Sequence, residues 1–245
     1  MRLVLLLLFS GLLSSSLRAQ PLSIAAAADL APLEAPLRQA YPSTPLRFTF
    51  GSSGMLARQV ENGAPFDIYL SANEAFVNDL ARSGKLLPDS LRSYATGRLG
   101  LWSASGKIRS LRDLLQPGIH HVAIANPRHA PYGAAAEQTL RKLGLWERLQ
   151  PRLVLGENVR QSFEYAHTGN ADAVITAWSL IFDRGGILLP DSDHAPLRQA
   201  GGVVRGTTQE KAARAFLEFL TGPRGQAVLL RSGFFPPSPR PVPKR

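Results

Sequence analysis

Short apolar runs alternate with amphipathic helical patterns along most of this chain, and this alternation limits the fold more than any other feature. The first apolar run, Leu22 to Ala27, is followed by leucines at helical spacing from Leu30 to Leu37. The same order recurs twice, with strand patterns at 46–50 and 66–70, each followed by a helical one. Three such units in succession predict the α/β class, with mostly parallel sheets covered by helices.

The alternation continues in the second half of the chain. After a polar stretch around 88–98, strand patterns return at 99–102, 121–125 and 171–177. A strongly amphipathic helix is predicted at 209–220, where Phe216, Leu217 and Leu220 share one face with Ala212 and Ala213. The chain therefore carries enough regular elements for two α/β units.

The spacing of these elements favours two lobes with a ligand cleft between them. Segments near 97–103 and 195–204 fall where the chain would pass from one lobe to the other and return, so we expect hinge strands there. In this division residues 20–97 and 204–235 form lobe 1 and residues 98–203 form lobe 2. A single doubly wound sheet is the alternative that the same spacing allows.

The N-terminus has the pattern of an export signal. Met1 and Arg2 precede a solid apolar run from Leu3 to Phe9, and small residues follow up to Ala19. The run breaks at Ser10-Gly11, well short of the roughly 20 apolar residues that a membrane-spanning helix needs. We therefore expect residues 1–19 to be a cleaved signal peptide and the mature protein to be periplasmic. The chain has no Cys, so a lipid-modified cysteine and disulfides are both excluded.

The formal net charge is +10, but the basic residues are spread thinly. Some of them lie in the signal segment and others in or beside a Pro-rich basic tail at 236–245. This distribution gives weak support to an anionic ligand and equally weak support to contact with an acidic membrane surface. No basic stripe is interleaved with aromatic residues, so the sequence does not predict nucleic-acid binding.

Two turns carry the pattern of an anion-binding site. Gly51 to Gln59 and Ala125 to Gly133 each follow an apolar run and open an amphipathic one. Each should place the free N–H groups of a helix start at the carboxyl end of a strand. Two such turns facing each other would hold an oxyanion.

Catalytic and cation-binding readings of the same residues are weaker. A triad from Ser52 or Ser53 with His129 and Asp67 lacks the Gly-x-Ser-x-Gly elbow, so we expect no enzyme activity. The adjacent histidines at 120 and 121 would point to opposite faces of a strand, and no Cys or carboxylate cluster completes a set. The sequence therefore predicts no metal-cation site.

At this point the chain resembles a known family, the periplasmic molybdate- and tungstate-binding proteins of ABC importers, over nearly all of its mature length. The stretches that carry the resemblance are Ala25 to Leu30, Gly51 to Ala72, Ala125 to Gly133, Leu155 to Val159, and Phe216 to Phe234. The second is the most specific, because its residues agree in order and spacing over 22 positions. The resemblance implies a two-lobed type II periplasmic-binding-protein fold, molybdate or tungstate as ligand, no cofactor, and an ABC permease of the inner membrane as partner. We expect a monomer.

The resemblance also implies which residues bind the anion, through hydroxyls and backbone N–H groups and without Arg or Lys. Ser53 corresponds to the hydroxyl donor of the first lobe, and Ala28 and Asp29 to the first βα turn, whose N–H groups point inward. Tyr132 and Val159 correspond to positions in the second lobe.

Two departures from the family pattern leave the ligand open. Ala28 stands where many members have a Ser or Thr hydroxyl. Asp29 either caps its own helix and faces away from the ligand or points inward, where its carboxylate would accept the proton of hydrogen phosphate. Tyr132 either offers its hydroxyl, where this chain has Thr176 in place of a donor found in some relatives, or walls the cleft with its ring. Sulfate or phosphate is therefore an alternative ligand, and an enzyme or sensor on this fold is an alternative of another class.

Overall fold

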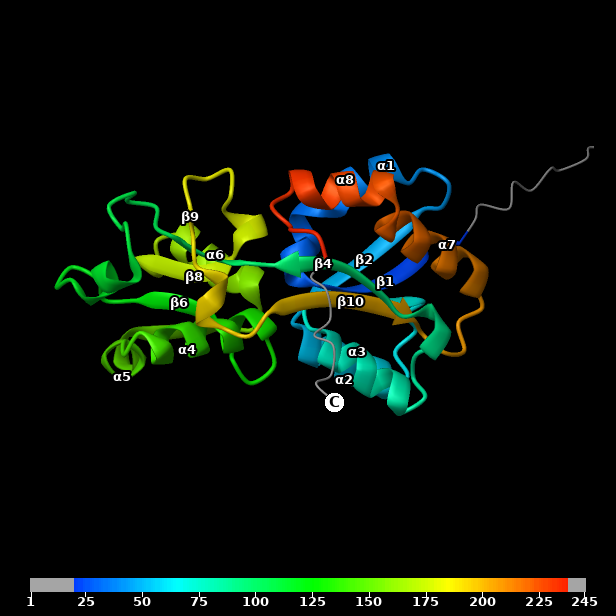
Figure 1. The fold of residues 1–245 in the computed structure, drawn as a ribbon, viewed down its shortest axis with the longest axis horizontal. Coiled ribbons are helices and arrows are strands. Elements are labelled where there is room, and N and C mark those ends of the chain that lie inside the picture. Colours follow the sequence, from blue (N-terminus) through cyan, green and yellow to red (C-terminus); the bar gives the residue numbers. More distant parts are fainter. Residues whose placement is uncertain (1–19, 238–245) are drawn as a thin grey trace, which may run out of the picture.

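The computed structural model describes residues 20–237, which form two lobes side by side (Figure 1). Each lobe is built on a five-stranded sheet, in the order β2-β1-β3-β10-β4 in the first and β7-β6-β8-β5-β9 in the second. The predicted signal peptide, residues 1–19, lies outside the described residues, as does most of the predicted tail.

The first lobe contains both ends of the described chain. Its strands are β1 (Leu22–Ala27), β2 (Leu46–Gly51), β3 (Ile68–Ser71), β4 (Arg92–Gly97) and β10 (Leu197–Val203). Its helices are η1 (Ala28–Leu33), α1 (Glu34–Ala40), α2 (Ser53–Glu61), α3 (Glu74–Arg82), η2 (Pro88–Ser90), α7 (Glu210–Thr221) and α8 (Pro223–Arg231). Here η marks a 3-10 helix.

The second lobe is formed by the middle of the chain. Its strands are β5 (Leu99–Trp102), β6 (Val122–Ala125), β7 (Leu153–Gly156), β8 (Ala173–Ala177) and β9 (Ile187–Leu188). Its helices are η3 (Leu111–Leu115), α4 (Pro131–Lys142), α5 (Trp146–Leu149), η4 (Gln150–Arg152), α6 (Val159–His167), η5 (Trp178–Leu180) and η6 (Asp191–Asp193).

Both sheets are mixed, which corrects the expectation of mostly parallel sheets. The pairs β1·β2, β1·β3, β6·β7 and β6·β8 are parallel. The pairs that involve β10 and β5 are antiparallel. The parallel pairs come from the βα units that the periodicity predicts. The antiparallel pairs involve β5, with which the chain enters the second lobe, and β10, with which it returns to the first.

The chain crosses between the lobes twice, as Figure 1 shows for β4 and β10. The outward crossing, between Gly97 and Leu99, lies inside the segment expected to form the first hinge. The return crossing comes earlier than the expected boundary at 203, because β10 pairs with β3 and β4 along its length. We therefore propose that lobe 2 ends near residue 196 and that the whole of β10 belongs to lobe 1.

Each lobe has its own hydrophobic core. All six residues of β1 are buried, and its small side chains suit a strand covered on both faces. One apolar cluster fills the second lobe, and it also includes Ala27, Ala28 and Ala72 at the edge of the first. The inner surfaces of the two lobes are therefore in apolar contact.

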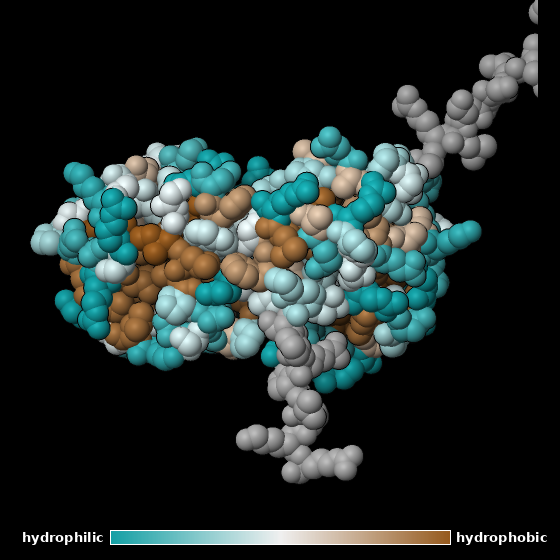
Figure 2. Space-filling model, turned by 45° about the horizontal axis from the view of Figure 1, so that its top comes forward, coloured by the Kyte–Doolittle hydropathy of each residue, from teal (hydrophilic) through white to brown (hydrophobic). Residues whose placement is uncertain are grey.

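Apolar residues reach the surface in both lobes, and two of them lie at the edges of the second sheet. Figure 2 shows them on its left half, which is the second lobe, while hydrophilic residues cover most of the right half. Leu155 of β7 and Leu188 of β9, the two edge strands, are among the exposed large apolar side chains. None of the helices within residues 20–237 has the length and apolar character needed to cross a bilayer.

Candidate functional site

A cavity lies between the lobes, at the carboxyl ends of β1, β2 and β3. Its unfilled space is about 200 Å³, including the mouth. Its walls include all five residues predicted from the sequence to form the site: Ala28, Asp29, Ser53, Tyr132 and Val159. None of its lining residues is Lys or Arg. The structure thus brings the five residues together, and their role in binding stays a prediction.

Four helix starts converge on this cavity. Ala28 opens η1, Ser53 opens α2, Val159 opens α6, and Tyr132 is the second residue of α4. N–H groups in a first helical turn have no partner within the helix and carry a partial positive charge. Within residues 20–237, no hydrogen bond with a loop or side chain involves the N–H of any of these four residues. They are therefore available to an anion.

The residues that precede these helices explain why the N–H groups stay available. Ala27 and Ala130 occupy the N-cap positions of η1 and α4, and an alanine side chain cannot accept a hydrogen bond. Ser52 is the N-cap of α2, but its side chain makes no capping bond. Only Asn158, before α6, caps in the usual way, by accepting from the N–H of Gln161 at 3.1 Å.

The hydroxyl of Ser53 is held ready to donate. Ser53 is 1% exposed, and its Oγ accepts a hydrogen bond from the N–H of Ala72 at 3.0 Å. Its hydroxyl hydrogen makes no bond with an acceptor among the described residues. The Ser53 side chain therefore has one donor hydrogen left, on the wall of the cavity.

Of the two alternatives left open for Asp29, the structure does not show the cap at the start of its own helix. Ala27, not Asp29, is the N-cap of η1, and Asp29 lies inside that 3-10 helix with no exposed surface. Its Oδ2 accepts hydrogen bonds from Tyr132 Oη at 2.9 Å and from Gln199 Nε2. Burial raises the pKa of Asp29 to about 6, although these two donors and the nearby N–H groups of Asp29 and Leu30 work in the opposite direction.

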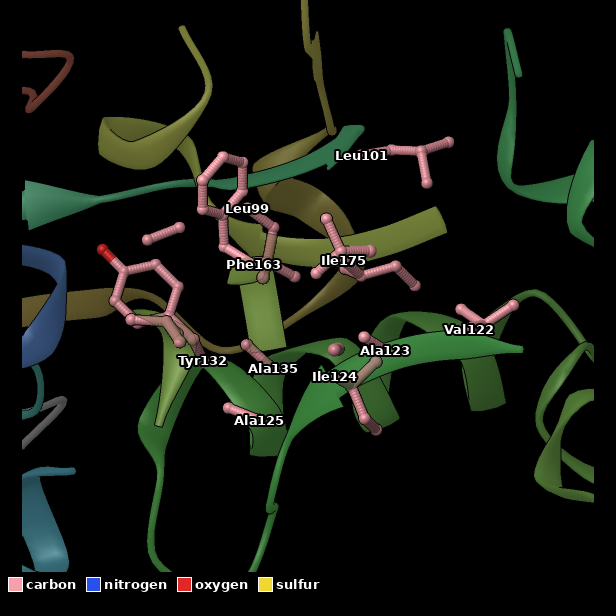
Figure 3. Packing of buried hydrophobic residues seen from close by; sticks show 14 of the residues in the cluster. Leu99, Leu101, Val122, Ala123, Ile124, Ala125, Tyr132, Ala135, Phe163 and Ile175 are labelled. Carbon is pink, nitrogen blue, oxygen red and sulfur yellow. The ribbon is translucent and has the colours of Figure 1, made fainter. Parts of the chain in front are cut away.

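The hydroxyl of Tyr132 makes hydrogen bonds within the protein. It donates to Asp29 and accepts from Gln199 Nε2 at 3.0 Å. Figure 3 shows it directed away from the core of the second lobe, towards the blue segment of the first. Its pKa is raised well above the ordinary value, first by burial and then by the charge of Asp29, so it stays protonated. The ring therefore lines the cavity, while the hydroxyl joins the lobes.

The lobes also meet at the mouth of the cavity. The N–H of Gly54 donates to the carbonyl of His129 at 2.9 Å, and Ser52 Oγ lies 2.8 Å from His129 Nδ1. His129 Nε2 is 3.6 Å from the carboxylate of Glu157. Asp67, the acid considered for a triad, instead accepts from the N–H of Ser23 and from Gln209, so that triad is not assembled.

Sequence reasoning missed several residues of this region. Gln199 is a fully buried amide on β10, and Ser179 of η5 donates to the carbonyl of Asp29 at 2.9 Å. A polar residue inside a predicted strand was the available signal for Gln199, but Arg198 of the same strand weakens it. Thr176 is also buried, and its hydroxyl donates to the carbonyl of Val159 at 3.1 Å, which helps to hold the start of α6.

The histidines at 120 and 121 lie away from the cavity, where their N–H groups donate to the carboxylate of Asp172. Across residues 20–237, no three side chains of His, Cys, Asp and Glu gather as a metal ion would require. The chemistry that this arrangement offers is hydrogen-bond donation to an anion.

Comparison with known proteins agrees with this geometry. The family model of bacterial extracellular solute-binding proteins matches residues 22–235. The molybdate-binding protein ModA of Rhodobacter capsulatus is 35% identical over 191 residues, which is 76% of each chain. ModA of Azotobacter vinelandii is 33% identical over 236 residues, which is 92% of this chain and 94% of that protein.

Solved structures show the same fold. The periplasmic molybdate-binding protein of Azotobacter vinelandii superposes with a TM-score of 0.83 at 30% identity, covering 89% of this chain and 100% of that one. The sulfate-binding protein SubI of Mycobacterium tuberculosis has a TM-score of 0.72 at 17% identity, covering 88% and 86% of the chains, and shares the fold alone. The chain belongs to the bacterial extracellular solute-binding proteins, a family of binding proteins rather than enzymes.

Proposed function

We propose that this protein captures a tetrahedral oxyanion, molybdate or tungstate, in the cavity between its lobes. The observation that carries the proposal is that four backbone N–H groups without a hydrogen-bond partner among the described residues, each at a helix start, converge with the Ser53 hydroxyl on one cavity. None of the residues lining this cavity is Lys or Arg. Such a wall consists of donors, and dianions that carry no proton at neutral pH need donors only. The relatives at 33–35% identity are named for molybdate binding, which supports molybdate first. Tungstate follows because it is a tetrahedral dianion of nearly equal size.

Phosphate is the second candidate, and one observation favours it. Asp29, whose carboxyl is buried, is one of the residues that line the cavity. If it stays ionised when the ligand binds, it accepts the proton that hydrogen phosphate carries.

We further propose that residues 1–19 direct export and are then cleaved off. The mature protein would deliver the anion to an ABC permease in the membrane. One relative, from Bacillus subtilis, is named a putative ABC transporter substrate-binding lipoprotein and is 28% identical over 192 residues. Closing of the lobes on the ligand would give the permease a surface that differs from that of the open form.

Thermal unfolding of the ligand-stripped mature protein separates the two candidates. The panel is molybdate, tungstate, sulfate and phosphate, with chloride as the control at matched ionic strength. Ligand at 1,000 times Kd should stabilise the protein by about 4 kcal/mol, or roughly 8–16 °C at about 2–4 °C per kcal/mol. Shifts with molybdate and tungstate support the first candidate, and a shift with phosphate alone supports the second. No shift with any oxyanion would reject both.

A pair of serine variants tests the site itself. Ser53→Ala removes a donor to a charged ligand, so we expect affinity to fall by about 1–3 kcal/mol, or about 5- to 150-fold. Ser90→Ala is the matched control, because Ser90 is also buried and also accepts a backbone N–H, that of Val203 at 2.9 Å, but lies in η2 outside the cavity lining. It should lower stability without changing affinity. Equal affinity of Ser53→Ala and the wild type would remove Ser53 from the site.

A further inference from the structure

The wall of the cavity contains an acid where a dianion is expected. Asp29 is fully buried and lines the cavity. Its Oδ1 is buried and has no hydrogen-bond partner among the described residues. An ionised carboxylate beside a dianion in such a dry site would repel it.

The carboxyl group of Asp29 is held in place by contacts from both lobes. Tyr132, from α4 of the second lobe, and Gln199, from β10, both donate to its Oδ2. Ser179 of η5 holds the backbone carbonyl of the same residue. The repulsion must therefore be relieved by a change of charge rather than by a change of side-chain position.

Among residues 20–237, no cationic side chain forms an ion pair with this carboxylate. The titratable groups that face it are the phenols of Tyr132 on α4 and Tyr94 on β4, and the negative charge of Asp29 raises the pKa of both further above the level set by burial. Glu34 and Arg38 of α1 form an ion pair with each other. Within residues 20–237, the ionisable side chains of β2 and α6, which also pack against η1, make no hydrogen bond or ion pair with Asp29: Arg47, Arg160, Glu164, Tyr165 and His167.

We propose that Asp29 takes up one proton from solvent when the oxyanion binds and then, as a neutral carboxylic acid, donates that hydrogen to an oxygen of the anion. An O–H bond forms at Oδ1, and no other covalent bond changes. Oδ2 continues to accept from Tyr132 and Gln199, so the existing contacts between the lobes remain. The acid thereby supplies a side-chain donor beside Ala28, which has none. This inference rests on the proposed function and adds that binding of the anion is coupled to uptake of one proton.

Burial supports the direction of this change. It already raises the pKa of Asp29 to about 6 in this arrangement of the lobes, and a dianion beside the carboxyl raises it further. The protonated form is then favoured in the bound state, so affinity is highest at low pH. Affinity falls as pH rises between the pKa of the free and of the bound protein, by up to tenfold per pH unit.

Isothermal titration calorimetry with molybdate tests the proposal directly. The titration is run at pH 7 in two buffers whose ionisation enthalpies differ, because the difference in heat then counts the protons taken up. We expect the wild type to take up close to one proton and its Kd to rise between pH 6 and 8. Binding of molybdate without proton uptake would overturn the inference while leaving the proposed function intact.

Two variants identify the group that is protonated. In Asp29→Asn the amide N–H₂ replaces the acid as donor, and the amide oxygen can still accept from Tyr132 and Gln199. This variant should bind molybdate with no proton uptake and a flat pH profile. His129→Gln, which removes a titratable side chain beside Ser52, should keep the uptake. Uptake that persists in Asp29→Asn, or that disappears in His129→Gln, would assign the proton elsewhere and overturn the inference.

Two further outcomes are decisive without any variant. If the wild type binds phosphate alone and takes up no proton, Asp29 acts as an acceptor and the inference is wrong. If molybdate, tungstate, sulfate and phosphate give neither heat nor a shift in unfolding temperature, the proposed function fails and the inference fails with it. The wild-type measurement decides the matter even if Asp29→Asn does not fold.

Discussion

Gly54 is a point of close backbone contact between the lobes, and replacing it with Ala should separate ligand affinity from stability. A Cβ at this position would lie 2.9 Å from the carbonyl oxygen of His129 and 3.2 Å from its Cα. Because these are backbone atoms, no side-chain rotation can relieve the overlap. The two lobes would have to move apart, and the hydrogen bond from the Gly54 N–H to that carbonyl, now 2.9 Å, would lengthen.

The expected loss follows from these two contributions. Overpacking of a well-packed contact costs about 1–3 kcal/mol, and the hydrogen bond contributes about 0.5–1.5 kcal/mol. Both apply to the closed form that holds the ligand, so affinity should fall by about one to three orders of magnitude. The ligand-free protein can open, and Ala restricts the unfolded chain more than Gly does. Its stability should therefore be unchanged or about 0.4–1 kcal/mol higher.

The assay is calorimetric titration with molybdate together with urea unfolding of the ligand-free protein. Gly118→Ala is the matched control, because a Cβ there would meet no atom within 4 Å. It should bind as tightly as the wild type. If Gly54→Ala also binds like the wild type, the contact between Gly54 and His129 is not part of the ligand-bound form, and the reasoning fails.

Two further predictions concern residues that join the lobes. His129→Gln removes the imidazole beside Ser52, so molybdate affinity should fall about 2- to 10-fold in calorimetry, and an unchanged Kd would contradict this. Tyr132→Phe removes a donor to Asp29 that joins the closed lobes, so molybdate affinity in calorimetry should fall by about 5- to 150-fold. Tyr94→Phe is its matched control, because that buried hydroxyl donates to the carbonyl of Ser71; it should lose stability but keep its affinity. Equal affinity losses in the two phenylalanine variants would refute the role given to Tyr132.

Local sequence patterns predicted the turns of the site well, for a physical reason. A strand that ends in a short turn and opens a helix places N–H groups at the carboxyl edge of the sheet, whatever the rest of the fold does. The segments around Ser53 and Tyr132 follow this rule, and both reach the same cavity. The expected parallel pairs formed for the same reason, because each comes from a βα unit.

The sequence left two alternatives open for Asp29, because the environment of this residue comes from distant parts of the chain. An Asp after an apolar strand is a good N-cap by local rules, but η1 begins one residue earlier, at Ala28. Its hydrogen-bond donors, Tyr132 and Gln199, lie 103 and 170 residues further along the sequence. No periodicity or spacing rule connects positions so far apart.

The earlier end that we propose for the second lobe could not be read from the sequence, for a related reason. The pattern around Ala195 to Val204 predicts a strand, but a strand that leaves one sheet and one that joins another look alike in sequence. The antiparallel pairing of β10 with β3 and β4 assigns this strand to the first sheet, and this pairing depends on the whole of that sheet.

A crystal structure of the mature protein with molybdate tests the central claim most directly, because the anomalous signal of molybdenum locates the anion. We predict one strong peak in the cavity between the lobes, with an anion oxygen within hydrogen-bond distance of Ser53 Oγ and others facing the N–H groups of Ala28, Tyr132 and Val159. A peak at another place, such as the basic surface beside Lys85 and Arg205, with the cavity free of molybdenum, would contradict the account.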